Sequence, residues 1–385
     1  MKLINFKRKF IILICAVSLC FIKTFAWSTA SGETGMNFLK IAVGVRGIGM
    51  GEANTAVADD LGSLYWNPAG LANVKFVEMQ FMYNKWFQDI TSQYAAFSIP
   101  FRKHTPGNVY KNLGTIALSV NSLTIADIQG YDANGAQTGK LEASDIAVGL
   151  SYAHSLSNKL QFGFTAKHLS ETLDGTNAAA YCADIGLLYK TFKGIGLGFA
   201  AQNLGTKIKF IEEEGLLPAA YRIGASYNRN IFAQSFLIAA DIVMPNDNDT
   251  YFCTGLEYWI KDIIAFRTGF RSGLDVGEGL RLGAGFKTSM FLLDYAFAGF
   301  GELGDTHRIS LSVRFGKGAQ MGREMSMYNT AKHYYEEKQY SLAVIELNKL
   351  LKLNPANRKA LDLLKKSYNG LEKSVKEAEA KGKKK

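Results

Sequence analysis

The residues that could carry catalysis in this sequence are few and scattered. Asp59 and Asp60 form an adjacent carboxylate pair, but neighbouring residues on a helix point apart, which is poor geometry for acid–base chemistry. No HExxH or GxSxG motif occurs, and the histidines lack metal-ligand spacing. We therefore predict that the protein is not an enzyme and has no metal or other cofactor. The histidines are His104, His154, His168, His307 and His333.

The strongest local pattern is the glycine-rich segment 41–74, IAVGVRGIGMGEANTAVADDLGSLYWNPAGLANV. A glycine-rich turn before a helix could cradle a phosphate. No strand of a βαβ unit precedes these glycines and no Lys-Ser/Thr pair follows them, which disfavours phosphate binding. The glycines instead predict close approaches of the backbone. We expect a short helix over 52–60 and a helical turn that begins at Pro68.

Strands must position this segment. From residue 75 onward the chain divides into about fourteen segments of about ten residues with period-two alternation, the length that a tilted membrane strand needs. The expected strands are 75–86, 91–101, 113–122, 145–154, 159–168, 180–190, 194–202, 220–228, 235–243, 251–259, 263–271, 280–287, 290–298 and 307–315.

The two faces of these strands differ in a way that favours a membrane barrel. In 159–168, one face carries Leu160, Phe162 and Phe164. The other carries Gly163 and Thr165. A soluble sandwich also alternates, but its polar face is usually rich in Lys, Glu and Thr, whereas Gly, Ala and Ser predominate here. We predict an all-β transmembrane barrel of about 14 antiparallel strands, whose closure leaves no free edge.

Isolated charges on the inward side of the strands predict ion pairs inside the barrel. We expect Asp59 and Asp60 to pair with lumen arginines such as Arg267 or Arg281, and Trp66 to pack under the barrel mouth. The main lumen charges are Arg222, Arg267, Arg271, Arg281, Asp184 and Asp294. The same parity includes Glu78, Lys167, Asp241, Glu257, Lys287, Arg308 and Arg314.

The connections between strands alternate in length, which is typical of outer-membrane barrels with long extracellular loops and short periplasmic turns. Long connections are expected at 123–144, 169–179 and 203–219, and short ones at 155–158 and 191–193. Residues 102–112 are an exception, because this pattern places them on the periplasmic side. An even number of strands puts both chain termini in the periplasm.

The positive charge lies at the two ends of the chain. Of the net charge of +10, residues 1–26 contribute five basic residues and no acid, and residues 317–385 contribute 16 basic and eight acidic residues. The middle of the chain, with 23 basic and 26 acidic residues, has a charge of −3. Nucleic acid is therefore disfavoured as a partner.

Residues 1–26 are predicted to be a secretory signal peptide. Basic residues precede a 13-residue apolar run over 10–22, which is too short to span a membrane as a helix. Ala26 and Ala30 each offer a small residue for cleavage. The alternative is an uncleaved amphipathic helix of the core.

Four cysteines occur, and Cys15 and Cys20 fall within the predicted signal. Lipidation at Cys20 is disfavoured, because Leu19 stands where a small residue is needed. Cys182 and Cys253 have no metal-ligand neighbours. An exported compartment permits a disulfide, but we favour two free, inert thiols.

The C-terminal part, 317–380, is predicted to be an all-α unit, followed by a basic tail at 381–385. Residues 324–355 resemble one tetratricopeptide repeat. A third helix is expected over 358–378, with Asn357 as its cap. One repeat cannot bury its faces well, so the unit is either a periplasmic handle that binds proteins or a solvated cap under the barrel. The repeat positions are Ala331, Tyr334, Tyr340, Ala343, Leu347 and Pro355.

The glycine-rich segment also resembles the PorV/PorQ family, whose barrels are similar to the FadL fatty-acid transporters. This resemblance implies an outer-membrane barrel at 75–316 with a plug at 27–74 inside it. The residues that carry it, as structural or binding residues of the plug, are Arg46, Gly47, Gly49, Met50, Gly51, Asp59, Asp60, Trp66, Asn67, Pro68 and Gly70.

Two functions follow from the resemblance. The PorV-like function is to bind or shuttle exported proteins in a type IX-like secretion pathway, with secreted proteins or periplasmic secretion components as partners. The FadL-like alternative is passive transport of hydrophobic small molecules. Outer-membrane lipid is expected as a neighbour in both.

Overall fold

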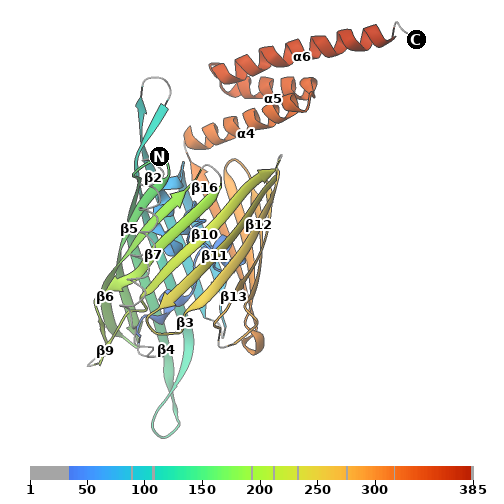
Figure 1. Cartoon of the computed structure of the whole chain (residues 1–385). Helices are drawn as coiled ribbons and strands as arrows, with labels where there is room; N and C mark the ends of the chain where they lie inside the picture. Colours follow the sequence, from blue (N-terminus) through green and yellow to red (C-terminus); the bar gives the residue numbers. More distant parts are fainter. Residues whose placement is uncertain are drawn as a thin grey trace, which may run out of the picture.

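Fourteen antiparallel strands close into a barrel, because the first strand is hydrogen-bonded to both the second and the last (Figure 1). The computed structural model describes residues 34–87, 90–105, 109–191, 194–210, 213–231, 234–274, 276–315 and 317–382, so the predicted signal peptide lies outside the described residues. The predicted transmembrane barrel is confirmed. Its strands are β1 (Val77–Lys85), β2 (Thr91–Thr105), β3 (Val109–Tyr131), β4 (Gln137–Ser155), β5 (Leu160–Leu173), β6 (Thr176–Lys190), β7 (Ile195–Gly205), β10 (Ala220–Ile231), β11 (Gln234–Pro245), β12 (Tyr251–Ile260), β13 (Ile264–Arg271), β14 (Leu280–Lys287), β15 (Phe291–Gly299) and β16 (Asp305–Phe315).

The barrel wall turns its apolar side chains outward. On β5, Gly163 and Thr165 are buried while Phe164 is exposed, and Leu150 on β4 is 58% exposed. Exposed Phe, Leu, Ile and Tyr side chains recur on every strand of the barrel wall. An apolar belt of this extent is stable against hydrocarbon rather than water. None of the described helices is long and apolar enough to cross a membrane.

Several predicted long connections are in fact paired strands. β3 extends to Tyr131 and pairs with β4 from Gln137, and β5 and β6 meet at a tight turn after Leu173. The predicted connection 102–112 is likewise mostly the paired ends of β2 and β3. Figure 1 shows the β2–β3 and β3–β4 hairpins projecting beyond the barrel. The ladder can continue there without alternation, because only a wall against hydrocarbon requires an apolar face.

The two ends of the barrel differ. At the terminal end, β1 begins and β16 ends, and the C-terminal helices follow (Figure 1). The opposite end, called here the loop end, carries a small hairpin of β8 (Ile208–Phe210) and β9 (Glu213–Gly215) between β7 and β10. Residue Thr34 forms a bridge to Leu216 beside this hairpin.

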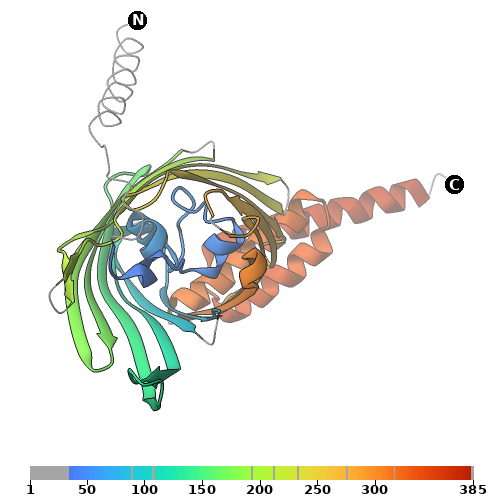
Figure 2. The same cartoon turned by 90° about the horizontal axis from the view of Figure 1, so that it is seen from below.

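Residues 34–74 fold inside the barrel and are called here the plug (Figure 2). Its short helices are η1 (Asn37–Lys40), α2 (Val45–Gly49), α3 (Ser63–Trp66) and η2 (Pro68–Asn73). Pro68 begins a helical turn as predicted, with Asn67 Oδ1 accepting from Ala69 N–H.

The predicted helix over 52–60 is wrong. Glu52 has a φ of 70°, and the segment consists of turns. The carboxylate of Asp241 on β11 accepts the N–H groups of Asn54 and Thr55 at 3.0 and 2.9 Å. The barrel wall therefore supplies the acceptors that an internal helix would otherwise provide.

The plug lies against the wall at backbone contact distance. A Cβ atom added to Gly269 of β13 would lie 2.1 Å from Gly51 N, and one added to Gly198 of β7 would lie 2.2 Å from Thr55 O. Gly51 itself has a φ of 64°, which favours glycine. Similar contacts with plug residues occur at Gly163, Gly186, Gly224 and Gly255. Glycines on the inner wall thus fit the plug closely onto one side of the barrel.

The C-terminal helices are α4 (Lys317–Glu336), α5 (Tyr340–Leu353) and α6 (Arg358–Gly382). They stack at the terminal end, with α6 farthest from the barrel (Figure 1). Ala331, Leu347 and Leu350 are fully buried between them. Asn357 Oδ1 accepts from Ala360 N–H, as expected of the cap of α6.

We predict that Gly269→Val prevents the plug from seating, because its side chain would overlap the backbone of Gly51. The expected loss is about 3 kcal/mol of unfolding free energy. Urea unfolding followed by heat-modifiable gel migration measures it. Gly135→Asn is the control, since nothing lies within 4 Å of a Cβ there and Asn tolerates its φ of 80°. Equal stability of the two variants would contradict this packing.

Candidate functional site: the plugged lumen

Arg46 joins the plug to the wall through buried charge. Its Nη2 and Nε atoms donate to the two carboxylate oxygens of Glu257 on β12, at 2.7 and 2.8 Å. Arg267 on β13 donates to the same Glu257 at 2.6 Å and to Asp294 on β15 at 2.7 Å. Such two-pronged pairs between arginine and carboxylate are strong and directional. The network therefore spans the plug and three strands.

The adjacent carboxylates of the plug share Arg46. Arg46 Nη1 lies 2.5 Å from Asp59 Oδ1 and 3.5 Å from Asp60 Oδ2. Burial raises the pKa of Asp60, whereas the charges of Arg46 and Lys190 lower the pKa of the more exposed Asp59. The partner of both is Arg46, not Arg267 or Arg281 as predicted. Arg46, Asp59 and Asp60 therefore form an ion-pair cluster within the plug, called here the latch.

A second contact point lies on β10 and β11. Asp241 Oδ2 accepts from Thr55 Oγ1 at 2.6 Å in addition to the two backbone groups. Arg222 donates to the carbonyl of Glu52 at 2.7 Å and to Thr55 Oγ1 at 3.1 Å. Its guanidinium lies 4.9 Å from the ring centroid of Trp66. Side chains of the wall thus form hydrogen bonds with the backbone of the plug segment 52–55.

The remaining motif residues pack within the plug. Trp66 is fully buried and covers Gly47, where a Cβ would lie 2.6 Å from the indole nitrogen. Asn67 Nδ2 donates to the carbonyls of Thr55 and of Leu187 on β6. Gly49 and Gly70 also allow close contacts because they lack side chains: Gly49 faces Gly283, and Gly70 faces Ala58. Met50 is buried against β11 and β12.

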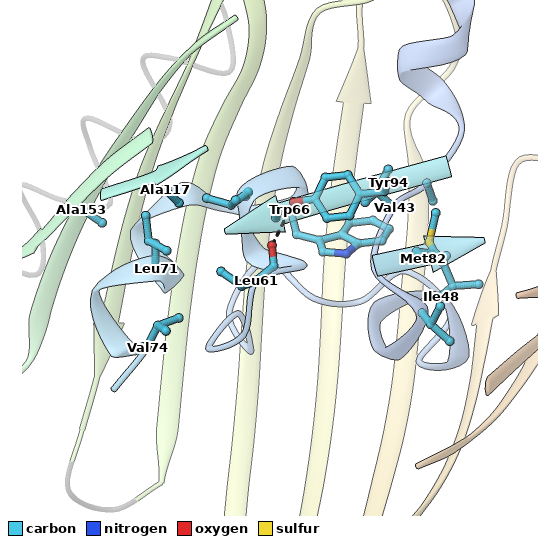
Figure 3. Close-up of a cluster of buried hydrophobic side chains, with 14 of the residues drawn as sticks. Val43, Ile48, Leu61, Trp66, Leu71, Val74, Met82, Tyr94, Ala117 and Ala153 are labelled. Carbon is cyan, nitrogen blue, oxygen red and sulfur yellow. Dashed lines mark hydrogen bonds between the residues drawn. The ribbon is translucent and has the colours of Figure 1, made fainter. Parts of the chain in front are cut away.

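Two large apolar clusters occupy the lumen, besides a smaller one around Met50. The middle cluster contains plug residues such as Val43, Leu61 and Trp66, together with Met82 and Tyr94 of the wall (Figure 3). Tyr94 also donates its hydroxyl to the carbonyl of Leu61 at 3.2 Å. The loop-end cluster contains the plug residues Met36, Phe38 and Leu39 and the wall or loop residues Ala147, Leu169, Ala178, Ala180, Cys182, Ile208 and Leu217. The plug segment 36–45 contributes to both clusters.

Other predicted lumen charges have different surroundings. Asp184 on β6 pairs with Lys167 on β5 at 2.5 Å, away from the arginines. Arg271 pairs with Glu52 of the plug at 2.9 Å. Arg281 is 1% exposed, and its Nε and Nη2 atoms have no hydrogen-bond partner among the described residues. Its Nη1 donates to two backbone carbonyls, and the guanidinium lies 4.7 Å from the Phe300 ring.

The sequence did not single out several residues that complete these contacts. Glu52, Thr55 and Lys190 contact charged partners but were not expected to do so. The inward parity of Lys190 at the end of its strand could have identified it. Thr55 lacks such a signal, because its role depends on an irregular turn. Cys182 and Cys253 are both buried and free, and no group of three His, Cys, Asp or Glu in the described ranges is arranged to hold a metal.

In the helical unit, some of the repeat positions are buried and others are not. Ala331, Ala343 and Leu347 are buried. Pro355 is exposed, and Tyr334 and Tyr340 are intermediate. Leu342 and Ile345 of α5 are exposed, as are Leu361 and Tyr368 of α6. An apolar surface thus remains on α5 and α6.

The sequence matches no protein-family model and no curated protein sequence. Among solved structures, the toluene transporter TodX of P. putida matches with a TM-score of 0.50 at 11% identity, over 71% of this chain and 99% of TodX. The CymD monoaromatic hydrocarbon channel matches with a TM-score of 0.50 at 12% identity, over 71% and 98%. A Pseudomonas aeruginosa FadL homologue matches with a TM-score of 0.46 at 11% identity, over 71% and 98%. At such identities the likeness concerns the fold alone, a closed barrel like those of TodX and CymD.

We predict that two arginine substitutions differ strongly in their effect on the free energy of unfolding. Arg267→Met leaves Asp294 buried without its partner and should cost about 3–5 kcal/mol. Arg281→Met removes a buried charge that has no ion pair among the described residues, so stability should stay within about 1 kcal/mol of the parent. Denaturant midpoints in detergent measure both. Equal losses would show that Arg281 has a partner as strong as Asp294.

Proposed function

We propose that this protein is an outer-membrane channel through which small hydrophobic molecules pass passively. The observation that carries the proposal is the run of apolar side chains in the lumen, where the middle and loop-end clusters follow one another along the plug. Water-filled porins have a polar lumen instead. The names of TodX and CymD, a toluene transporter and a monoaromatic hydrocarbon channel, support a ligand of this class.

In this proposal, plug residues 34–43, called here the cork, move to open the path. The cork is attached at the loop end by few polar contacts, among them Gly35 N–H to the Leu216 carbonyl at 2.9 Å and an ion pair between Lys40 and Asp247. The plug beyond residue 45 is held by the Arg46 and Asp241 networks. Movement of the cork alone would expose the loop-end cluster and leave the latch intact.

We place the loop end outside the cell and the terminal end in the periplasm. The short terminal-end turns and the strand count support this orientation. The helical unit is then periplasmic, and the plug motif is a structural element rather than a catalytic site. The surroundings of the wall are outer-membrane lipid.

The test is to lock the cork. A Cβ at Gly35 would lie 2.6 Å from Ile208 Cγ2, so Gly35→Cys with Ile208→Cys should form a disulfide once Cys182 and Cys253 are replaced by Ala. Toluene uptake into vesicles that contain the oxidised protein should fall to the level of empty vesicles. Reduction with dithiothreitol should restore it, because the cork is free again.

Each single cysteine variant is the matched control and should transport toluene under both conditions. Glucose-driven swelling should stay at background throughout. Full toluene uptake by the oxidised double variant would refute movement of the cork. Glucose entry equal to toluene entry would refute selection for hydrophobic solutes.

A second candidate is the PorV-like function, in which the barrel binds secreted proteins or secretion components. Its support is the motif at residues 46–70 together with the apolar surface on α5 and α6. The full chain should then capture exported proteins that share a C-terminal sorting domain. Deletion of 320–385 tests whether the helices or the barrel loops form the binding site. Failure of the full chain to retain purified cargo would remove this candidate.

A further inference from the structure

We propose that a cavity at the terminal end binds an organic monocarboxylate. The cavity has a volume of about 520 Å³ and lies between the plug segment 56–59 and the ends of β6, β7, β10 and β11. This volume is within the range of small-molecule sites. Its lining includes Lys190, Arg229 and Arg46, opposed by the single acid Asp59. The cavity is separate from the two apolar clusters, so the proposal does not depend on what passes through the lumen.

Besides the exposed Arg229, Lys190 is the lining cation available to a ligand. It ends β6, and its side chain is 33% exposed. Its nearest acid in the described part of the chain is Asp59, with Nζ and Oδ2 3.9 Å apart. An ammonium group has three donors, and a contact of this length leaves them to water or to a ligand. A carboxylate in the cavity would accept from them.

Arg46 is not available in the same way. Its Nε and Nη2 atoms are held by Glu257, and Nη1 is held by Asp59. Asp59 therefore lies between Arg46, which is held by acids, and Lys190, which lines the cavity, and 44% of the Asp59 side chain is exposed. A ligand carboxylate must compete with Asp59 for Lys190. Neutral Asn at this position should consequently strengthen binding.

The body of the ligand is specified by the opposite lining. Ala56, Val57 and Leu237 form an apolar part of the cavity, and all three are buried. Contact with these side chains favours an aliphatic or aromatic group over a sugar or a polyanion. The predicted ligand is therefore a carboxylate on a short apolar body.

The experiment uses the full chain in detergent micelles and isothermal titration with 4-phenylbutyrate. The uncharged 4-phenylbutanamide is the matched probe. Lys190→Gln should weaken phenylbutyrate binding roughly tenfold, because a charge-assisted hydrogen bond is lost. Asp59→Asn should tighten it, and Lys190→Arg should retain it. Lys261→Gln, at an exposed terminal-end turn that does not line the cavity, should leave it unchanged.

Several outcomes would overturn the proposal. They are equal affinity for the acid and the amide, equal affinity of the parent and Lys190→Gln, weaker binding to a folded Asp59→Asn, or no binding of phenylbutyrate at millimolar concentration. Heat-modifiable migration confirms that each variant is folded before titration. Lys190→Gln decides the outcome if Asp59→Asn does not fold, because Lys190 touches the Glu257 network only through Asp59, at 3.9 Å.

Discussion

The structure depends on the burial of Glu257 between two arginines, one on the plug and one on the wall. A buried carboxylate without partners is costly, and Arg46 and Arg267 both donate to this one. Arg267 binds Glu257 and Asp294 within the wall, but Glu257 gains its second arginine, Arg46, only when the plug is inside the barrel. Charge pairing therefore favours insertion of the plug into the wall that β12, β13 and β15 form.

Shape then determines where the rest of the plug lies. The wall glycines allow the backbone of residues 49–56 and 67–69 to approach the strands directly, and Asp241 and Arg222 supply hydrogen bonds to that backbone. The cork lacks such a fit and contributes mainly apolar side chains. On one side of the lumen, the plug is held by close backbone contacts and hydrogen bonds to the wall. On the other side, the cork is held only by the hydrophobic effect and a few polar contacts.

Much of this could be predicted from sequence, because period-two alternation depends only on which neighbour faces lipid. That rule identified the strands and put charges such as Arg267 and Asp294 on one side. It could not define strand ends such as Tyr131, since the ladder continues where alternation no longer matters. The helix expected over 52–60 failed because its backbone is bound by Asp241, which is distant in sequence. The partner of Asp59 was missed because the plug folds back on itself, and pairing within it has no parity signal.

The position of the helical unit has a consequence for biogenesis. The strand that closes the barrel, β16, ends at Phe315, and α4 begins at Lys317. The closing strand is therefore an internal segment of the chain, followed by a basic helical stack that leaves no spacer. Any assembly factor that recognises β16 must accommodate a folded helical unit directly at the end of this strand. A force applied to the helices would act on the hydrogen-bonded pair of β16 and β1, where the barrel closes.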